Sequence, residues 1–465
     1  MQALLRDLRF DGRAAGKLKA GSGVIALRHS PIMKRVAGTL IAGVMMAATA
    51  WPQDLPPGVL LLSRAKNQAK EELRRLENIS CLETVQREYQ PAKGDMRPLD
   101  TIRLEVLFDG HDEFFASPGG RKFSEQNPIR FAGSGVLGNG VFGGYLSDIL
   151  LNESISNEYR GEEEIGGRHV ARYDYRLPLM WSKNTVQTPE GSGTVGLHGS
   201  YWVDPQTYDV VLLEVVADDI PPTLPITEMT ASIDYARTRL AGDLVVLLPD
   251  SAEFRIAKFS GETSHNRMEF THCRVFSAES TLSFGADSAE QTPRFGVSSV
   301  DDTLRTLPAG LRITVKLRNG ISGDSAVGAL IDGAVDGNVT VKHKVVIATG
   351  SRVLGRIRRL ERYSDPFPYF VVALEFTEAE LHGIRYRFYA DPVNVEHIAG
   401  VEDLLSIPHA TETRGLMGSG SSITSKSDTM WLPDLPGVTT FFFKGRTLDL
   451  PQGFRTTWKT RPLKQ

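Results

Sequence analysis

The 465-residue sequence predicts a mainly β protein, in which an antiparallel sheet with one or two helices precedes a small C-terminal β-barrel or sandwich. Two observations support this fold class. Segments in which apolar and polar residues alternate recur between turn signals, and this pattern is typical of strands that bury one face. Only one long segment has apolar residues three and four positions apart, as an amphipathic helix requires.

The first 50 residues are predicted to be an upstream extension followed by a secretory signal peptide. Lys34 and Arg35 precede an uncharged run over 36–50, which closes on the small residues Ala48-Thr49-Ala50. This is the layout of a signal peptide, and the run is shorter than the roughly 20 residues that span a bilayer. We therefore expect Met33 to be the true start and cleavage to follow Ala50. The alternative is a membrane anchor that is not cleaved.

Export would place the mature chain in the periplasm or outside the cell, or in association with the outer membrane. Residues 1–50 carry eight Lys and Arg and two Asp and Glu, so the rest of the chain has a net charge of −9, against −3 for the full sequence. Such a chain lacks the concentrated basic surface that binds nucleic acid. In an oxidising compartment, Cys81 and Cys273 are expected to form one disulfide. Two buried free thiols are the alternative.

The chain divides into two predicted domains, 55–285 and 305–465, joined by a polar linker over 286–304 that has no periodic apolar face. The first domain begins with a helix that ends near Asn78, and a second helix is predicted over 142–152. The first helix is predicted by Leu62, Ala65, Ala69, Leu73 and Leu76. The predicted strands of this domain are 81–89, 101–108, 168–177, 199–203, 210–216, 228–235, 253–259 and 266–277.

The second domain contains two similar boxes, Leu307-Pro-Ala-Gly310-Leu-Arg-Ile313 and Ile347-Ala-Thr-Gly350-Ser-Arg-Val353. Each box is predicted to be a turn that opens a strand, and strands over 371–376 and 385–389 follow. A flexible Gly/Ser-rich excursion is expected over 411–430. The segments 439–445 and 455–458 are then expected to form a closing hairpin.

Short motifs in both domains resemble known families. Tyr201-Trp-Val-Asp204-x-x-Thr207, followed by Ile233-Asp234-Tyr235, resembles the periplasmic lipoprotein-sorting and sigma-regulator half-barrels over about 60–285. The resemblance implies a curved antiparallel half-barrel with a helix on its concave side. The two glycine boxes resemble a β-barrel domain of conjugation-apparatus proteins over about 305–390. The whole chain resembles exported bacterial proteins of acidobacterial type, through Leu76, Cys81, Glu83 and Thr84 and through Phe270, Cys273, Arg274 and Phe276.

Several motifs invite a catalytic or cofactor interpretation, and each has a simpler explanation. The glycines of 133–140 satisfy G-x-G-x-x-G, but they follow Asn127-Pro128 rather than a buried strand, so we expect a flexible loop that leads into a helix. His111-Asp112-Glu113 lies beside a predicted hairpin tip, and adjacent strand residues point to opposite faces, so we expect a solvated turn. Glu162-Glu163-Glu164 is likewise expected to be an acidic turn.

Two further groups contain residues that can bind a metal or act as acid and base. His265, His272 and Cys273 could suggest zinc, but residues 272 and 273 alternate faces and Cys273 has Cys81 to pair with. Asp204 and Asp234 could form a carboxylate pair, but Asp204-Pro205 is ordinary turn chemistry. We therefore expect no catalytic residue, no cofactor and no metal, and the protein is predicted not to be an enzyme.

Three functions remain open. The first is a non-catalytic binding or carrier protein, whose half-barrel holds a hydrophobic ligand or a protein segment. Its candidate binding residues are Ile102, Leu104 and Val106, which lie on one face of a predicted strand. The second is a structural component of an envelope assembly, and the third is a hydrolase with an unrecognised site. The expected partner is a hydrophobic ligand or an envelope protein, and no stable membrane span is expected after signal cleavage.

Overall fold

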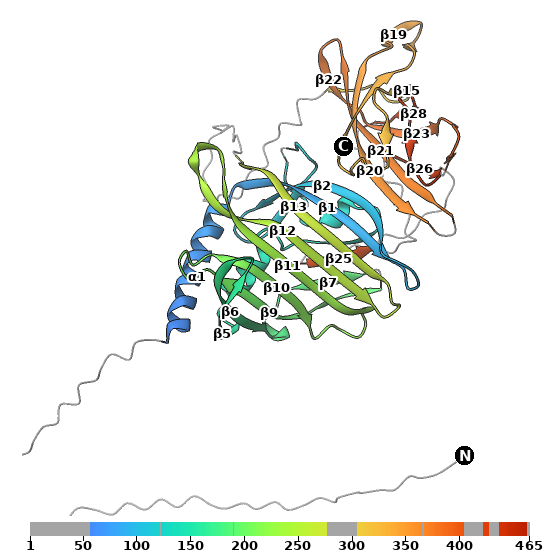
Figure 1. Cartoon of the computed structure of the whole chain (residues 1–465). Helices are drawn as coiled ribbons and strands as arrows, with labels where there is room; N and C mark the ends of the chain where they lie inside the picture. Colours follow the sequence, from blue (N-terminus) through green and yellow to red (C-terminus); the bar gives the residue numbers. More distant parts are fainter. Residues whose placement is uncertain are drawn as a thin grey trace, which may run out of the picture. The chain divides into compact units, whose positions relative to one another are not determined.

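The computed structural model describes residues 56–120, 122–188, 190–276, 305–364, 367–403, 422–426 and 437–462. These residues form a mainly β protein, as predicted (Figure 1). The predicted signal peptide, the linker and most of the Gly/Ser-rich excursion lie outside the described residues. Neither of the two described α-helices is both long and apolar enough to cross a bilayer.

Helix α1 (Pro57–Leu76) forms where the helical periodicity predicts it. Proline suits its first turn, where backbone N–H groups have no helical partner. One face of the helix is buried, and Asn78 just beyond its end adopts φ 69°, the left-handed conformation that stops a helix. The buried side chains of this face are Ala65, Ala69, Glu72, Leu73 and Leu76.

The first long sheet is an antiparallel half-barrel of ten strands. Its burial pattern alternates along the strands, so one face is packed and the other is exposed. β5 contains the acidic run Glu162–164, so the prediction of an acidic turn is wrong, and the turn lies at Gly166-Gly167 instead. In spatial order the strands are β3 (Glu113–Ala116), β2 (Arg97–Phe108), β1 (Ile79–Gln90), β13 (Thr263–Val275), β12 (Val245–Lys258), β11 (Ile226–Arg239), β10 (Val210–Asp218), β9 (Gly196–Val203), β6 (Arg168–Leu177) and β5 (Ser156–Ile165).

Cys81 and Cys273 form the predicted disulfide, with their Cα atoms 4.0 Å apart. Both lie in the middle of the sheet, because the first and last long strands, β1 and β13, are neighbours. The bond therefore joins adjacent strands, and the two ends of the sheet are β3 and β5. The register shifts at this point, and His272 adopts φ 52° in the resulting bulge.

A small sheet and a short helix make up a second group of elements beside the half-barrel. Helix α2 (Gly144–Leu150) is shorter than predicted. The glycine-rich segment before it, predicted to be a flexible loop, forms strand β4 because its backbone pairs with β25. The small sheet runs in the order β4 (Gly135–Gly138), β25 (Ser422–Lys426), β7 (Thr185–Thr188) and β8 (Gly191–Thr194). The short 3₁₀ turns are η1 (Pro128–Phe131), η2 (Leu179–Trp181) and η3 (Ala241–Asp243).

The C-terminal region forms the second long sheet, and both glycine boxes open strands in it as predicted. Gly310 and Gly350 have φ of 85° and 82°, in the left-handed region that glycine adopts without steric cost. The main path is β14 (Arg305–Thr306), β22 (Ile384–Arg387), β21 (Tyr369–Leu381), β20 (Arg352–Tyr363), β17 (Leu330–Val335), β15 (Arg312–Leu317), β28 (Arg455–Thr460) and β23 (Ala390–Val395).

The predicted closing hairpin at the end of the chain is wrong. β26 (Val438–Lys444) pairs with β21 and β24 (Val401–Asp403), whereas β28 pairs with β15 and β23. Between them, β27 (Asp449–Leu450) pairs with β16 (Ile321–Ser322), so the chain crosses over instead of turning back. A further two-stranded ladder joins β18 (Val339–Val341) to β19 (Lys344–Ile347).

Candidate functional site

The inner face of the half-barrel carries the residues that the sequence proposed for binding. Ile102, Leu104 and Val106 of β2 are 0%, 1% and 0% exposed. The register pairs them with Val85, Glu83 and Cys81 of β1. The alternation therefore places all three on the packed face, as expected. Their role in binding remains a prediction, because other parts of the protein cover them.

The segment from Gly135 to Gly143 contributes to this cover. A Cβ atom at Gly135 would lie 3.3 Å from the Leu99 side chain, and one at Gly143 would lie 3.0 Å from the ring of Phe108. Leu99 and Phe108 lie near the two ends of β2, so the two ends of the segment pack against the two ends of the strand. Glycine permits this close approach, because any larger residue would meet the side chains of β2.

Buried polar groups of the half-barrel hold the covering segment. The carboxylate of Glu113 accepts hydrogen bonds from the backbone N–H groups of Gly140, Gly143 and Gly144, at 2.7, 2.9 and 3.2 Å. Burial raises the pKa of Glu113, and these donors oppose that rise. The Asn266 amide donates to the backbone carbonyl of Val136 at 3.0 Å. Glu113 was predicted to lie in a solvated turn, and that prediction is wrong because its side chain enters the core.

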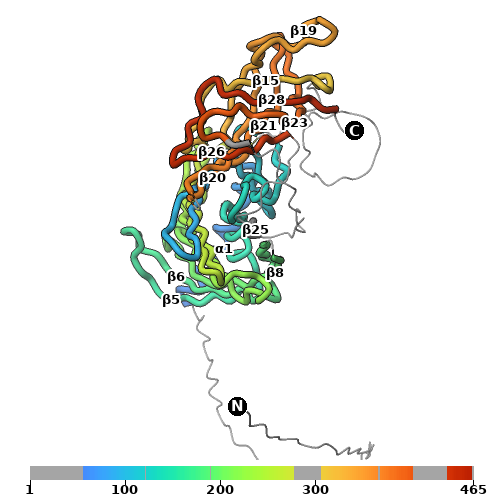
Figure 2. Tube along the Cα trace, turned by 90° about the vertical axis from the view of Figure 1, so that its right-hand side faces the viewer, coloured from blue at the N-terminus to red at the C-terminus, as the bar shows by residue number. Residues whose placement is uncertain are grey.

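Strand β25 completes the small sheet between β4 and β7. Residues 423–426 pair antiparallel with 135–138, and residues 422–424 pair parallel with 185–187. Figures 1 and 2 show β25 beside strands that come from a distant part of the chain. This part of the predicted Gly/Ser-rich excursion is therefore a strand.

A cluster of four buried charges lies beside Ser134, just before β4. Arg87 forms two hydrogen bonds with Asp100, both at 2.6 Å, and donates to the backbone carbonyl of Ser134 just before β4. In β20, Arg359 pairs with Glu361 through its Nε at 2.6 Å. Arg87 and Glu361 approach to 3.8 Å, so the two pairs form one cluster, and all four side chains are at most 1% exposed.

This charge cluster is electrically balanced and bound to its surroundings. The Tyr363 hydroxyl donates to Glu361 at 2.8 Å and lies 3.0 Å from the Ser134 hydroxyl. Burial opposes ionisation of Glu361, but Arg359 and Arg87 together hold its pKa below the ordinary value. The cluster therefore joins β1, β2 and β20 to the segment that precedes β4.

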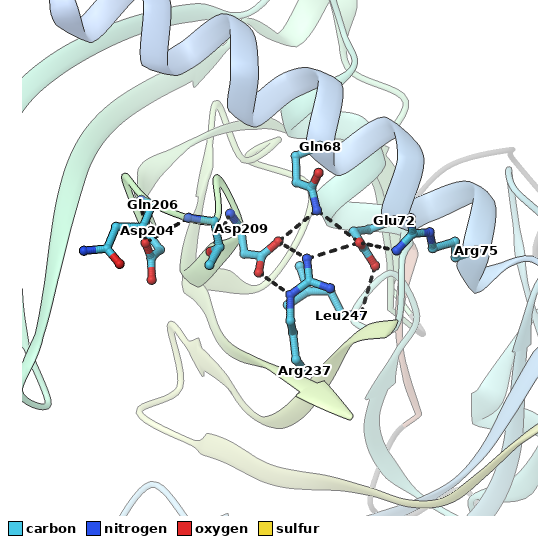
Figure 3. A network of polar contacts seen from close by, with 9 residues as sticks. Gln68, Glu72, Arg75, Asp204, Gln206, Asp209, Arg237 and Leu247 are labelled. Carbon is cyan, nitrogen blue, oxygen red and sulfur yellow. Dashed lines mark hydrogen bonds and ion pairs between the residues drawn. The ribbon is translucent and has the colours of Figure 1, made fainter. Parts of the chain in front are cut away.

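A second polar network fixes helix α1 on the half-barrel (Figure 3). Glu72, whose side chain is 1% exposed, accepts from the backbone N–H of Leu247 in β12 at 3.0 Å and from Arg237 in β11 at 3.3 Å. Arg237 also forms two hydrogen bonds with Asp209, at 2.6 and 2.7 Å. Gln68 donates to both Glu72 and Asp209. The network orients the helix, and its ionised groups pair with one another.

Glu83 is the buried acid that the hydrolase hypothesis would require. Burial and the charge of Glu113 raise its pKa to about 8. It lies on the packed face of β1, where Leu104 and Phe270 are its register partners. A cavity of about 520 Å³ lies elsewhere, along β5, β6, β9 and β10. There Arg160 pairs with Asp174 at 2.6 Å, so these charges are already paired.

The other residues considered as metal or acid–base sites make structural contacts. His265 contacts Glu88 and Glu253, and Cys273 is in the disulfide. Asp204 accepts from the backbone N–H groups of Gln206 and Thr207, which confirms the predicted turn. Within the described residues, no group of three or more His, Cys, Asp and Glu side chains could hold a metal ion.

No family model and no curated protein matches this chain. Three similar solved structures are a DUF1329 family protein from Desulfovibrio piger, a putative outer membrane lipoprotein-sorting protein domain from Vibrio parahaemolyticus and a LolA superfamily protein from Nitrosomonas europaea. They are 14%, 11% and 11% identical, with TM-scores of 0.26, 0.25 and 0.23. The matches cover 49%, 48% and 46% of this chain and 96%, 95% and 94% of those proteins.

Identities and TM-scores this low carry no functional conclusion for this chain. The curved half-barrel that the sequence motifs implied is the architecture that the first sheet has. The resemblance of 305–390 to a conjugation-apparatus barrel stays a prediction. So does the resemblance of the whole chain to exported proteins of acidobacterial type.

Sequence reasoning missed the charge cluster and β25. The alternation that places Cys81, Glu83 and Val85 on one face also places Arg87 there, so a charged residue at a core position was a usable signal. For Ser422–Lys426 the sequence carries little signal, because a short polar strand among glycines and serines has no distinctive periodicity.

Proposed function

We propose that this protein is a non-catalytic binding or carrier protein of the cell envelope, which holds a hydrophobic ligand or a protein segment at the inner face of its half-barrel. One observation carries the proposal. The apolar inner face is covered by separate segments, which include the glycine-rich stretch 135–143. This cover packs on the inner face without being part of the ladder of the half-barrel itself.

The apolar content of the inner face supports a ligand of matching chemistry. Ile102, Leu104 and Val106 together with Phe108 form a continuous apolar strip along β2. An exposed strip of this kind would be unfavourable in water, so a ligand that lies against it must be apolar. The strip offers contact area and few polar groups, which suits binding better than catalysis.

Two features support a location outside the cytoplasm. The segment 33–50 has the layout of a signal peptide. The Cys81–Cys273 disulfide is the kind of bond that persists in oxidising compartments. We therefore place the mature chain in the periplasm or outside the cell, and we keep outer-membrane association as part of the proposal.

An envelope assembly role is the second candidate, and strand β5 favours it. β5 stands at one end of the half-barrel order and pairs with β6. Ten residues of β5 thus offer a sheet edge to another strand. Its acidic run, Glu162–164, would repel acidic strands, so a partner strand at this edge should be neutral or basic.

Native mass spectrometry of the mature protein, purified from its own envelope, tests the proposed function. We expect a bound lipid or peptide mass on the wild-type protein. Val106→Thr places a hydroxyl on the inner face at nearly constant volume, and should lower the bound fraction about tenfold. Leu107→Thr, which changes the other face of the same strand, is the matched control.

Two outcomes would contradict the binding function. One is a wild-type protein that carries no bound mass and shows no saturable binding of a fluorescent fatty acid. The other is an equal loss of binding in both variants. A fixed stoichiometric complex with another envelope protein, insensitive to Val106→Thr, would favour the assembly role.

A further inference from the structure

Strand β25 completes the small sheet, but the strands before and after it in the chain do not depend on it for their own pairing. β24 and β26, which lie before and after β25 in the chain, pair directly with each other from Val401↔Phe443 to Asp403↔Phe441. Withdrawal of β25 would leave this ladder intact. The strand therefore contributes to the small sheet without being part of the C-terminal sheet.

The position that β25 occupies would also survive its withdrawal. β7 and β8 form a hairpin of their own, from Thr185↔Thr194 to Thr188↔Gly191. β4 is anchored to the half-barrel by Asn266 and, through Ser134, by Arg87. We call the space between β4 and β7 the strand slot, because both of its walls are held by contacts other than those to β25.

An empty strand slot would present two facing edges of unpaired backbone groups. Such edges are templates for another strand, because each unpaired N–H or C=O group that is buried costs free energy. β25 meets them with an antiparallel ladder to β4 and a parallel ladder to β7. Backbone pairing on both sides gives affinity with little dependence on side-chain identity.

We propose that the strand slot is a binding site for an extended segment of another polypeptide, and that residues 422–426 are its resident occupant. This inference rests on the proposed binding function and names the ligand class. The sequence of the occupant, Ser-Ile-Thr-Ser-Lys, indicates which foreign segments would bind. They should have about five residues, β-branched residues at the centre, no proline and little charge. Because proline has no backbone N–H, a segment with proline inside it would lose part of the ladder.

The resident strand regulates this site by competition. A tethered occupant has an effective concentration of about the millimolar range, so a foreign segment must displace it. The apparent affinity for that segment is its intrinsic affinity multiplied by the fraction of time for which the strand slot is empty. Weakening β25 should therefore increase binding of a foreign strand.

The test uses Thr424→Pro in the full mature chain, with Thr424→Ala as the matched control that keeps the backbone N–H. The probe is a fluorescent peptide with the sequence of residues 420–428, GSSITSKSD. We expect it to bind Thr424→Pro at least about tenfold more tightly than wild type or Thr424→Ala. The same peptide with proline in place of its threonine should not bind.

Hydrogen exchange tests whether the peptide binds in the strand slot. In Thr424→Pro, the amides of 135–138 and 185–188 should exchange faster, and the peptide should restore their protection. Unchanged protection in Thr424→Pro, or equal peptide binding by all three proteins, would overturn the proposal. So would peptide binding that leaves these amides unprotected.

A concentration-dependent dimer that exchanges β25 between copies would assign the strand slot to a second copy, and would also overturn the proposal of a foreign segment. The outcome is separable from the proposed function. A protein that fails the peptide test but carries a bound lipid retains its carrier role, and only the ligand class inferred for the strand slot is lost.

Discussion

The two long sheets differ in how strand order relates to chain order. In the half-barrel, from β5 to β13, neighbours in the sheet follow one another in chain order apart from short insertions, and β1 closes the set by pairing with β13. In the C-terminal sheet, β15 lies between β17 and β28, and β14 pairs in parallel with β22. Hairpin neighbours can be inferred from local pattern, whereas distant pairings depend on the whole fold.

The two regions also differ in how they are held. The half-barrel has the Cys81–Cys273 bond and the network under α1, whereas its link to the C-terminal region is the charge cluster of Arg87, Asp100, Arg359 and Glu361. The backbone adds to that link, because Arg103 donates to Val327 at 2.9 Å and Val327 donates to Thr101 at 2.8 Å. Covalent and local contacts therefore secure the half-barrel, while buried polar contacts join it to the C-terminal sheet.

Arg87→Met should have the largest effect, because it leaves Asp100 buried without its cation and leaves Glu361 with Arg359 alone. Breaking a buried ion pair costs about 3 to 5 kcal/mol of the free energy of unfolding. Urea denaturation should show this loss in both regions. Arg87→Met combined with Asp100→Leu should recover part of it, and a double variant as unstable as the single one would refute the ion-pair explanation.

Removal of the disulfide should destabilise the half-barrel more than the C-terminal region. Cys81→Ala with Cys273→Ala should lower the free energy of unfolding by about 2 to 5 kcal/mol, because the bond closes a long loop in the unfolded chain. Hydrogen exchange should report the loss first in β1 and β13. Wild-type protein unfolded with and without reductant is the control, and an equal loss in the C-terminal strands would contradict the comparison.

Arg237→Met should cost about 1.5 to 3 kcal/mol, because it removes charged hydrogen bonds from Asp209 and Glu72. Arg75 also pairs with Glu72, at 3.1 Å, but half of its side chain is exposed. Arg75→Met should therefore cost less than about 1 kcal/mol. Urea unfolding of both variants measures the contrast, and similar losses would show that the network does not depend on burial.

Glu83 should make the free energy of unfolding of the half-barrel fall as the pH rises. A carboxylate paired with a cation would have the opposite effect. Its folded pKa is about 8, above the ordinary 4.5, so the folded state keeps a proton that the unfolded state releases. Its stabilising contribution is complete below about pH 4.5 and is lost as the pH rises towards 8, by about 1 kcal/mol per pH unit. Glu83→Gln should flatten this dependence in urea unfolding. Glu71→Gln, on the exposed side of α1, should not.

Limited proteolysis should show how far the two regions are independent. Cleavage within 286–304 should give fragments that correspond to 55–285 and 305–465, as the sequence predicts, with little change in stability. The fragments should stay associated during gel filtration through the charge cluster and the ladders of β25, and they should associate more weakly in Arg87→Met. Preferential cleavage within 200–260 would contradict the predicted domain division.

Elements whose signal is local could be predicted from the sequence. The spacing of Ala65, Ala69, Leu73 and Leu76 specified α1, and strict alternation specified β2 and β6. Gly310 and Gly350 marked turns because positive φ is costly for other residues. The disulfide also followed from the sequence, since the chain has only two cysteines and a predicted export signal.

Tertiary structure alone decided the pairing of distant segments and the fate of charged residues within strands. Alternation places Arg87 on the packed face of β1, but the sequence does not show what pairs with it there, because Glu361 comes from another sheet. Likewise, Ser422–Lys426 is a strand only because β4 and β7 supply partners for its backbone. Loop closure over such separations depends on the whole fold, so the strand slot and the charge cluster become visible only when the chain is folded.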